Sequence, residues 1–269
     1  MFDSLFADGA KPVIGMVHLP ALPGAPKYDG DRADIFDAAT RDARRLAAGG
    51  VDAIMVENFG DAPFYPDDVP KHVVASMTRA TRAVVDTVDV PVGVNVLRND
   101  ADAALSVAAA AGGDFVRVNV HTGARVTDQG VIDGNAHETM RLRERIDADV
   151  ALLADHDVKH SAPIAARGFT AESVADGVER GLADAVVVSG TGTGRETDRS
   201  DLEHAVERRD TNDLDTPILV GSGVTAERVG AILDLADGVI VGTALKQDGD
   251  VGRPVSEARV RELVEAARS

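Results

Sequence analysis

A short segment in the middle of the chain carries three side chains that could move protons. In ALLADHDVKHSAP (151–163), Asp155 ends an apolar run, and Lys159 and His160 follow a few residues later. A carboxylate, an amine and an imidazole this close can shift one another's pKa values for general acid–base catalysis. Lys159 is one of only 5 lysines beside 23 arginines, which indicates a role as a Schiff-base amine or deprotonatable base. A surface loop with solvated charges is the alternative.

Polar residues also end several other apolar runs. Glu57 is a further candidate general base. Arg117 and Asn119 alternate with Val116 and Val118, so they share one face of their strand. A buried arginine is costly unless it meets a ligand or a carboxylate. Arg117 is therefore predicted to clamp a substrate anion, with a structural ion pair to Glu57 as the alternative. The predicted substrate-binding residues are His18, Asn58, Asn95, Arg117 and Asn119.

Glycine-rich segments after three late apolar runs predict phosphate contacts. Glycine lets backbone N–H groups approach an anion closely. One segment, Gly221–Gly223, stands before a helix expected to begin near Thr225, whose N-terminus would add to the site. The segment SGTGTGR (189–195) alternates glycine with hydroxyls and could close over a substrate. Tight turns and a flexible linker are the alternatives. The predicted phosphate-binding residues are Ser189, Gly190, Thr191, Gly221, Ser222, Gly223, Gly242 and Thr243.

The sequence gives little support for a resident metal. The seven histidines show neither HxH nor HExxH spacing, and the chain has no cysteine. A Mg²⁺ ion held by Glu57 and Asp155 together with a substrate phosphate is the one metal alternative, since Mg²⁺ needs few protein ligands. We therefore expect no metal site made by the protein alone, and the cofactor stays undecided.

The elements that must position these residues alternate regularly. Eight short β-branched runs lie at 13–18, 53–58, 91–96, 115–120, 150–155, 185–190, 217–223 and 238–243. Amphipathic, alanine-rich stretches follow them at 35–50, 73–88, 100–113, 135–146, 170–181, 201–209, 225–236 and 257–269. Near-continuous apolar strands are typical of a parallel sheet covered by helices. Eight repeats favour a (βα)8 TIM barrel, one domain over residues 1–269, rather than an open Rossmann-type sheet, because no GxGxxG follows the first strand. The candidate residues then lie at the C-terminal ends of the strands, where such barrels place their sites.

Composition narrows the class of protein further. With 44% hydrophobic residues the chain can build a core, and a net charge of −17 argues against a nucleic-acid partner. Asp outnumbers Glu by 33 to 12 and Lys is scarce, which is typical of a halophilic cytoplasm, although a GC-rich genome is the alternative. The absence of a long apolar run and of a leader pattern predicts a cytoplasmic protein without membrane insertion. Barrels commonly pair, so we expect a homo-oligomer.

Three blocks resemble a known family, the BtpA/SgcQ family, over essentially the whole chain. They are KPVIGMVHLPALPGAPKY (11–28), IMVENFGDAPF (54–64) and ADHDVKHSAP (154–163). The resemblance implies a barrel similar to those that bind ribulose phosphate. The family is named for photosystem I biogenesis, but no settled reaction comes with it, and an acidic, lysine-poor chain is unusual for a photosynthetic cyanobacterium. The matching blocks imply as family positions His18, Glu57, Asn58, Asp155, Lys159 and His160.

These features predict an enzyme of the isomerase or lyase type that acts on a small phosphorylated metabolite, either a sugar phosphate or a nucleoside-derived phosphate. Both reaction types need a base beside a carbonyl and a clamp for an anion. The predicted catalytic residues are Asp155, Lys159, Glu57 and His160. The alternatives are a non-catalytic assembly factor of the photosystem I type and a metabolite-binding protein without turnover.

Overall fold

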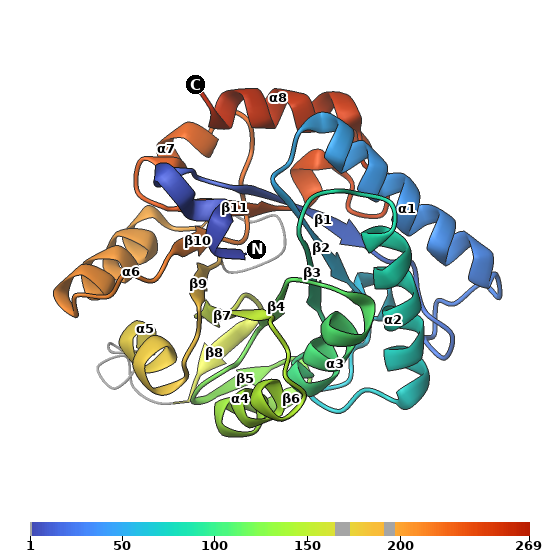
Figure 1. The fold of residues 1–269 in the computed structure, drawn as a ribbon, viewed down its shortest axis with the longest axis horizontal. Helices are drawn as coiled ribbons and strands as arrows, with labels where there is room; N and C mark the ends of the chain where they lie inside the picture. The colour runs from blue at the N-terminus through green and yellow to red at the C-terminus, as the bar shows by residue number, and fades with distance from the viewer. Residues whose placement is uncertain (1, 165–172, 191–196) are drawn as a thin grey trace.

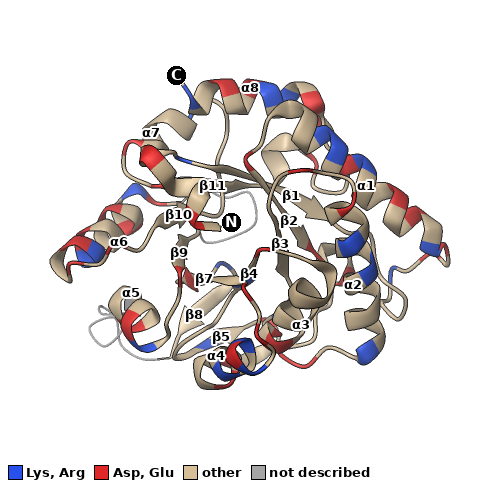
Figure 2. Cartoon of the chain, viewed as in Figure 1, with Lys and Arg blue, Asp and Glu red and all other residues tan. Residues whose placement is uncertain are grey.

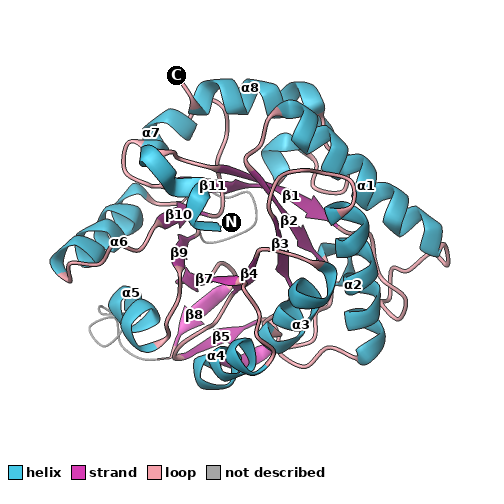
Figure 3. Ribbon diagram, in the orientation of Figure 1, coloured by secondary structure: helices cyan, strands magenta, loops and turns pink. Residues whose placement is uncertain are grey.

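The central feature of the fold is a closed barrel of parallel strands, seen in a computed structural model that describes residues 2–164, 173–190 and 197–269. Each strand pairs with its neighbours in parallel, and β1 closes the ring by pairing with both β2 and β11 (Figures 1 and 3). The barrel strands, in order around the ring, are β1 (Val13–His18), β2 (Ala53–Glu57), β3 (Val92–Asn95), β4 (Phe115–Val118), β7 (Ala151–His156), β9 (Ala185–Val188), β10 (Ile218–Val220) and β11 (Gly238–Val241). The prediction of a (βα)8 barrel is confirmed, and each predicted apolar run forms a barrel strand.

Helices surround the strands as an outer ring (Figure 1). They are α1 (Arg32–Gly49), α2 (Lys71–Val85), α3 (Ala101–Ala111), α4 (Ala136–Arg145), α5 (Ser173–Ala175) with the π-helical turn η3 (Asp176–Arg180), α6 (Arg199–Thr211), α7 (Val229–Leu233) and α8 (Glu257–Ala267). The ends of α1 show why these segments are helical. The Asp31 carboxylate accepts hydrogen bonds from the first free N–H groups, and Gly50 takes a left-handed φ of 92° at the other end.

The helix expected to begin near Thr225 is shorter than predicted. Residues 225–228 form a turn in which the Thr225 carbonyl accepts from the N–H groups of Arg228 and Val229, and α7 begins only at Val229. Its five residues do not give the extended N-terminus that was predicted to strengthen the phosphate site.

The barrel interior is apolar at its N-terminal end and becomes polar toward the other end. Inward-facing side chains of the strands pack into one cluster: Ile14, Met16, Ala53, Met55, Phe115, Leu153, Ala185, Val187, Leu219 and Ile240. Gly93 leaves the space that the Phe115 ring fills, because a Cβ there would lie 2.1 Å from the ring. The segment η1 (Phe2–Gly9) covers this end, and the rings of Phe2 and Phe115 lie 5.6 Å apart. The opposite end of the barrel is therefore its open mouth.

A small antiparallel sheet that the sequence did not predict stands beside the mouth. Its strands are β5 (Ala124–Thr127), β6 (Gly130–Asp133) and β8 (Ser161–Pro163), in the order β6-β5-β8. Val126 pairs with Val131 on one side and with Ala162 on the other. The sheet ties the loop after β4 to the segment after β7, which carries Lys159.

Three short 3₁₀ turns follow barrel strands at the mouth: η2 (Phe59–Asp61), η4 (Thr243–Leu245) and η5 (Gln247–Gly249). Charged residues of both signs lie along the outer helices (Figure 2). Within the described ranges, none of these helices combines the length and the apolar character needed to cross a bilayer.

Candidate active site

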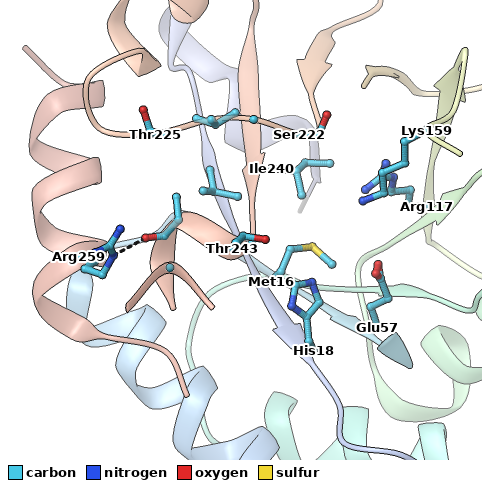
Figure 4. A pocket seen from close by; sticks show the side chains of 17 residues that line it. Met16, His18, Glu57, Arg117, Lys159, Ser222, Thr225, Ile240, Thr243 and Arg259 are labelled. Carbon is cyan, nitrogen blue, oxygen red and sulfur yellow. Dashed lines mark hydrogen bonds between the residues drawn. The ribbon is translucent and has the colours of Figure 1, made fainter. Parts of the chain in front are cut away.

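A cavity of about 240 Å³ opens at the mouth, between the ends of β1, β2 and β4 on one side and of β10 and β11 on the other (Figure 4). It brings together many of the residues that the sequence singled out. The predicted residues that line it are His18, Glu57, Arg117, Lys159, Gly221, Ser222, Gly223, Gly242 and Thr243. Segments far apart in the chain thus meet around one space of metabolite size.

Arg117 is held in place by a buried ion pair with Asp155. Its Nε lies 2.7 Å from Asp155 Oδ1 and its Nη2 lies 2.9 Å from Oδ2, and both side chains are at most 2% exposed. Asn119 Nδ2 donates to the same Oδ2 at 2.8 Å. The structural partner of Arg117 is therefore Asp155, which corrects the alternative that named Glu57.

This pairing also bears on the predicted catalytic role of Asp155. Both of its oxygens accept hydrogen bonds from Arg117 and Asn119, and its side chain is shut away from the cavity. Burial lowers the pKa of Arg117, but the Asp155 carboxylate and its hydrogen bonds, with a contribution from Glu57, raise that pKa above its ordinary value. Asp155 thus fixes a charged guanidinium at the cavity wall, and the structure does not place it as a proton acceptor for a substrate.

Glu57 is the carboxylate that faces the cavity. It ends β2, where it lies opposite His18 of β1 and Asn95 of β3 in the strand register. The residue is 3% exposed. Among the described residues, none makes a hydrogen bond or an ion pair with its side chain. A buried carboxylate that borders a cavity without a protein partner can exchange a proton with a bound molecule.

Lys159 borders the same cavity from the segment after β7. Arg98, which the sequence did not single out, donates from Nη2 to the Lys159 carbonyl and so fixes the backbone there. Burial lowers the pKa of the Lys159 amine, and the charge of Arg117 lowers it further, whereas Glu57 and Asp155 act in the opposite direction. The amine is therefore more easily deprotonated than that of an ordinary lysine.

His18 lies at the end of β1, with its ring 4.7 Å from the ring of Phe59. Burial, with smaller effects from the charges of Lys246 and Lys159, holds the pKa of His18 well below its ordinary value. Its Nδ1 is buried with no hydrogen-bond partner in the part of the chain that the structure describes. The cavity is thus lined by a neutral imidazole at neutral pH.

The glycines at the ends of β10 and β11 are required by close packing. A Cβ at Gly221 would lie 2.6 Å from Val187, and one at Gly242 would lie 2.8 Å from the His18 ring. Gly223 has a φ of 68°, in the left-handed region that favours glycine. The glycines therefore let the backbone come close to this end of the cavity, as an anion site built from N–H groups requires.

Two further residues at this end were not found from the sequence. Thr225 and Arg259 line the cavity beside Thr243 (Figure 4). Arg259 Nε donates to the Ala244 carbonyl at 2.7 Å, so the loop after β11 holds this guanidinium at the rim. Because Arg259 belongs to α8 and not to a strand end, a search of the strand ends could not reveal it.

Several predicted residues lie elsewhere. Asn58 braces two loops, because its Oδ1 accepts from the Leu97 N–H at 2.7 Å and its Nδ2 donates to Asp61 at 3.1 Å. His160 is exposed and lines a neighbouring hollow with Ser189 and Gly190, not the cavity. His160 has a left-handed φ of 57° and directly precedes β8 of the small sheet beside the mouth.

The remaining predicted residues border the site without lining it. Asn95 and Asn119 are buried inside the barrel, and Asn95 Nδ2 has no hydrogen-bond partner among the described residues. Ser189 Oγ lies 3.3 Å from Arg117 Nη2, and the Gly190 N–H donates to Ser222 Oγ at 2.6 Å. Thr191 lies outside the described residues.

The geometry gives no support to the alternative of a Mg²⁺ ion held by Glu57 and Asp155. Asp155 is saturated by a cation and an amide, which leaves no oxygen directed at a metal beside Glu57. Across residues 2–164, 173–190 and 197–269, no three His, Asp or Glu side chains come together in a group that could hold a metal ion.

Comparisons with known proteins agree with the fold and with the sequence blocks. The model of the BtpA family matches residues 9–269. An uncharacterised protein of Thermococcus kodakarensis is 48% identical over 96% of this chain and 95% of its own length. The photosystem I biogenesis protein BtpA of Synechocystis is 44% identical over 95% of this chain and 87% of its own. The sgc region protein SgcQ of Escherichia coli is 35% identical over 95% of this chain and 93% of its own length.

Solved structures show the same architecture at low sequence identity. Tryptophan synthase of Mycobacterium tuberculosis aligns with a TM-score of 0.63 at 22% identity, covering 100% of this chain and 96% of that one. N-(5′-phosphoribosyl)anthranilate isomerase of Pyrococcus furiosus aligns with a TM-score of 0.59 at 13% identity, covering 96% of this chain and 98% of that one. These likenesses show the fold alone.

Proposed function

The chain belongs to the BtpA family, and from that premise and the geometry of the cavity we propose that it is an enzyme acting on a small phosphorylated metabolite. The substrate class is a sugar phosphate or a nucleoside-derived phosphate, and the reaction is of the isomerase or lyase type. The observation that carries the proposal is the meeting of two glycine-rich strand ends with Glu57 and Lys159 in one cavity.

The phosphate would bind at the end of the cavity formed by β10 and β11. Residues Gly221–Gly223 and Gly242–Thr243 border this end, which is the recurrent phosphate position of such barrels. The Gly221 N–H already donates to the Val188 carbonyl at 2.8 Å, so the phosphate would bind N–H groups of the other residues. Arg259 adds a positive charge at the rim. The cavity, the positive charge of Arg259 and the close approach of the glycine-rich backbone all favour binding of an anion at this end.

The other end of the cavity would hold the reacting part of the molecule. Arg117, kept charged by Asp155, would stabilise negative charge on a carbonyl or hydroxyl oxygen. Glu57 would move a proton to or from carbon or oxygen, and the neutral His18 ring would donate or accept a hydrogen bond. Asp155 has a positioning role in this proposal, which differs from the role predicted from the sequence.

Thermal unfolding with and without phosphate esters tests the proposal. We expect sugar phosphates to raise the melting temperature while the parent sugars do not. A ligand at about 100 times its Kd adds about 2.7 kcal/mol to the free energy of unfolding. The variant Thr243→Asp places a carboxylate at the phosphate end and should abolish the shift, because like charges repel.

The matched control is Thr211→Asp, which adds the same charge at an exposed position of α6. It should keep the response to phosphate esters. If no phosphorylated compound stabilises the wild-type protein, the phosphate proposal is wrong.

A second candidate function rests on the Synechocystis relative, whose printed name assigns it to photosystem I biogenesis. In this case the barrel would be a scaffold that contacts other proteins, and the cavity residues would be dispensable. Introducing this chain into a Synechocystis strain that lacks its own BtpA would separate the two candidates. Rescue by the variant Glu57→Gln as well as by the wild-type chain favours the scaffold.

Ligand binding without turnover in any assay would instead indicate a metabolite-binding protein.

The acidic, lysine-poor composition supports placing the protein in a cytoplasm of high salt. Self-association through helices or loops is part of the same proposal, and light scattering at high salt would measure it.

A further inference from the structure

Lys159 differs from the other four lysines in its surroundings. Lys27 and Lys71 are exposed to solvent. Lys11 donates to the Leu233 carbonyl, and Lys246 forms a buried ion pair with Asp42 at 2.9 Å. Lys159 borders the cavity, and no hydrogen bond or ion pair reaches its amine from any residue that the structure describes.

The carboxylates near Lys159 do not neutralise it. Asp155 on β7 is bound by Arg117 and Asn119, and Glu57 on β2 faces the same cavity without forming an ion pair with the amine. The other charged groups around it are cationic: Arg117 on β4 and Arg98 after β3. Figure 4 shows Lys159, Arg117 and Glu57 on one wall of the cavity.

This arrangement suits a nucleophilic amine. A nearby guanidinium and a partly dehydrated site favour the neutral form, which has the lone pair that attacks carbon. A structural salt bridge would instead stabilise the protonated amine, which has no free lone pair, and none is present at Lys159 in the described part of the chain. The chain uses Arg for most of its positive charges, but a guanidinium stays protonated and could not replace an amine here.

We propose that Lys159 is the nucleophile of this site and forms an iminium with an aldehyde or ketone carbonyl of the substrate, while Glu57 transfers the protons. The inference rests on the proposed function and narrows it, because the substrate must then carry both a phosphate and a carbonyl group.

The step balances within the site. The Lys159 ammonium gives one proton to the Glu57 carboxylate, and the Nζ lone pair forms a bond to the carbonyl carbon while the C=O π pair moves to oxygen. A second nitrogen proton and the proton held by Glu57 pass to that oxygen, which leaves as water. The carbon–nitrogen double bond forms with one hydrogen and the positive charge on nitrogen. No oxidant or reductant is consumed, and Glu57 returns to its carboxylate form.

Trapping with pyridoxal 5′-phosphate tests the inference, because this probe carries an aldehyde and a phosphate. The protein is incubated with the probe at about pH 7 and reduced with borohydride. The labelled lysines are then identified by peptide mass spectrometry. We expect Lys159 to be labelled about tenfold or more faster than exposed Lys27 and Lys71. Inorganic phosphate should protect Lys159 and leave Lys27 unaffected.

The variants are Lys159→Arg, which keeps the charge but cannot form an iminium, and Lys27→Arg as the matched control. Lys159→Arg should lose the fast label, and Lys27→Arg should keep it. Pyridoxal, which lacks the phosphate, should label Lys159 more slowly than the phosphorylated probe. Dihydroxyacetone phosphate with cyanoborohydride repeats the measurement with a smaller carbonyl compound.

The outcomes separate the two proposals. Fast, phosphate-protected labelling of Lys159 supports the inference. If phosphate esters stabilise the fold but Lys159 is labelled no faster than Lys27 by either probe, the inference is overturned and the proposed function stands. If phosphate esters neither stabilise the protein nor protect Lys159, both are overturned.

Discussion

The pairing of Arg117 with Asp155 sets the character of the site at the scale of single residues. Two opposite charges lie inside the barrel with side chains at most 2% exposed. Their hydrogen bonds satisfy the carboxylate, and the guanidinium still borders the cavity. The pair carries no net charge, and it holds the Arg117 guanidinium in one fixed orientation at the cavity wall.

Replacing Asp155 by Asn should be costly for stability. The variant leaves the Arg117 charge buried without its counter-ion, and breaking such a pair costs about 3–5 kcal/mol. Urea unfolding followed by circular dichroism measures the change. Asp86→Asn removes the carboxylate from the exposed pair with Arg82 and should have little effect. An equally small loss for Asp155→Asn would contradict the buried pair.

The His18 ring should make stability sensitive to acid. Its pKa is lowered in the folded state, so as the pH falls below the unfolded pKa the unfolded chain binds a proton that the folded chain does not. Stability contributed by neutral His18 is therefore lost on acidification. Between about pH 8 and pH 5, wild-type protein should lose more unfolding free energy than His18→Gln does.

The control for this measurement is His137→Gln, since the His137 side chain is 66% exposed. Its pH profile should follow that of the wild-type protein. Identical profiles for His18→Gln and the wild type would show that His18 does not titrate differently in the two states.

At the residue scale, the sequence could predict which residue types gather at the mouth but not their partners. Strand alternation places Arg117 and Asn119 inward, as expected. Whether Arg117 pairs with Glu57 or Asp155 depends on side-chain reach across neighbouring strands, which residue spacing alone does not give. The left-handed φ of His160 is likewise not given by residue spacing.

At the scale of elements, the N-terminal segment η1 has a structural role that is separate from the site. Phe2 is 5% exposed and packs with its ring beside Phe115 at the end of the barrel away from the cavity. Packing at that end of such barrels contributes to stability, whereas the opposite end carries the site.

Truncating Phe2 to Ala should therefore destabilise the fold without changing ligand response. Loss of a buried aromatic ring costs about 3 kcal/mol, while the melting-temperature shift produced by phosphate esters should stay as in the wild type. Thermal unfolding measures both quantities. Tyr65→Ala, at a residue that is 48% exposed, is the control and should change stability little. A lost ligand response in the Phe2 variant would show that the two ends are coupled.

The strands were predictable because each is a short apolar run buried on both faces, and such a run can be recognised from the local sequence alone. The sheet of β5, β6 and β8 was missed because only its first two strands are adjacent in sequence. Its third strand joins from beyond β7, and no local pattern encodes that pairing. The start of α7 was misplaced because Thr225 is a plausible first residue of a helix, while the observed turn spans 225–228.

At the scale of the whole molecule, a net charge of −17 should make stability depend on salt. Repulsion between surface carboxylates opposes folding and is screened by dissolved ions. We expect the melting temperature to rise between about 0.1 M and about 2 M KCl. Repeating the measurement at lower pH, where fewer carboxylates are charged, should give a smaller rise. A melting temperature that is independent of KCl would contradict a fold adapted to high salt.

The packing of Phe2 against Phe115 at the N-terminal end of the barrel has a consequence for how ligands reach and leave the site. Between Phe2 and the cavity, the barrel interior is filled by a buried apolar cluster. Nearer the mouth it is filled by buried polar side chains that include Asn95, Asn119 and Arg117. Among the described residues this packing leaves the mouth as the way into the site. In the proposed reaction, the reactant, the water released and the product would therefore pass the same rim. A product bound there would block the next reactant, so if the chain has the proposed activity we expect its product inhibition to be competitive.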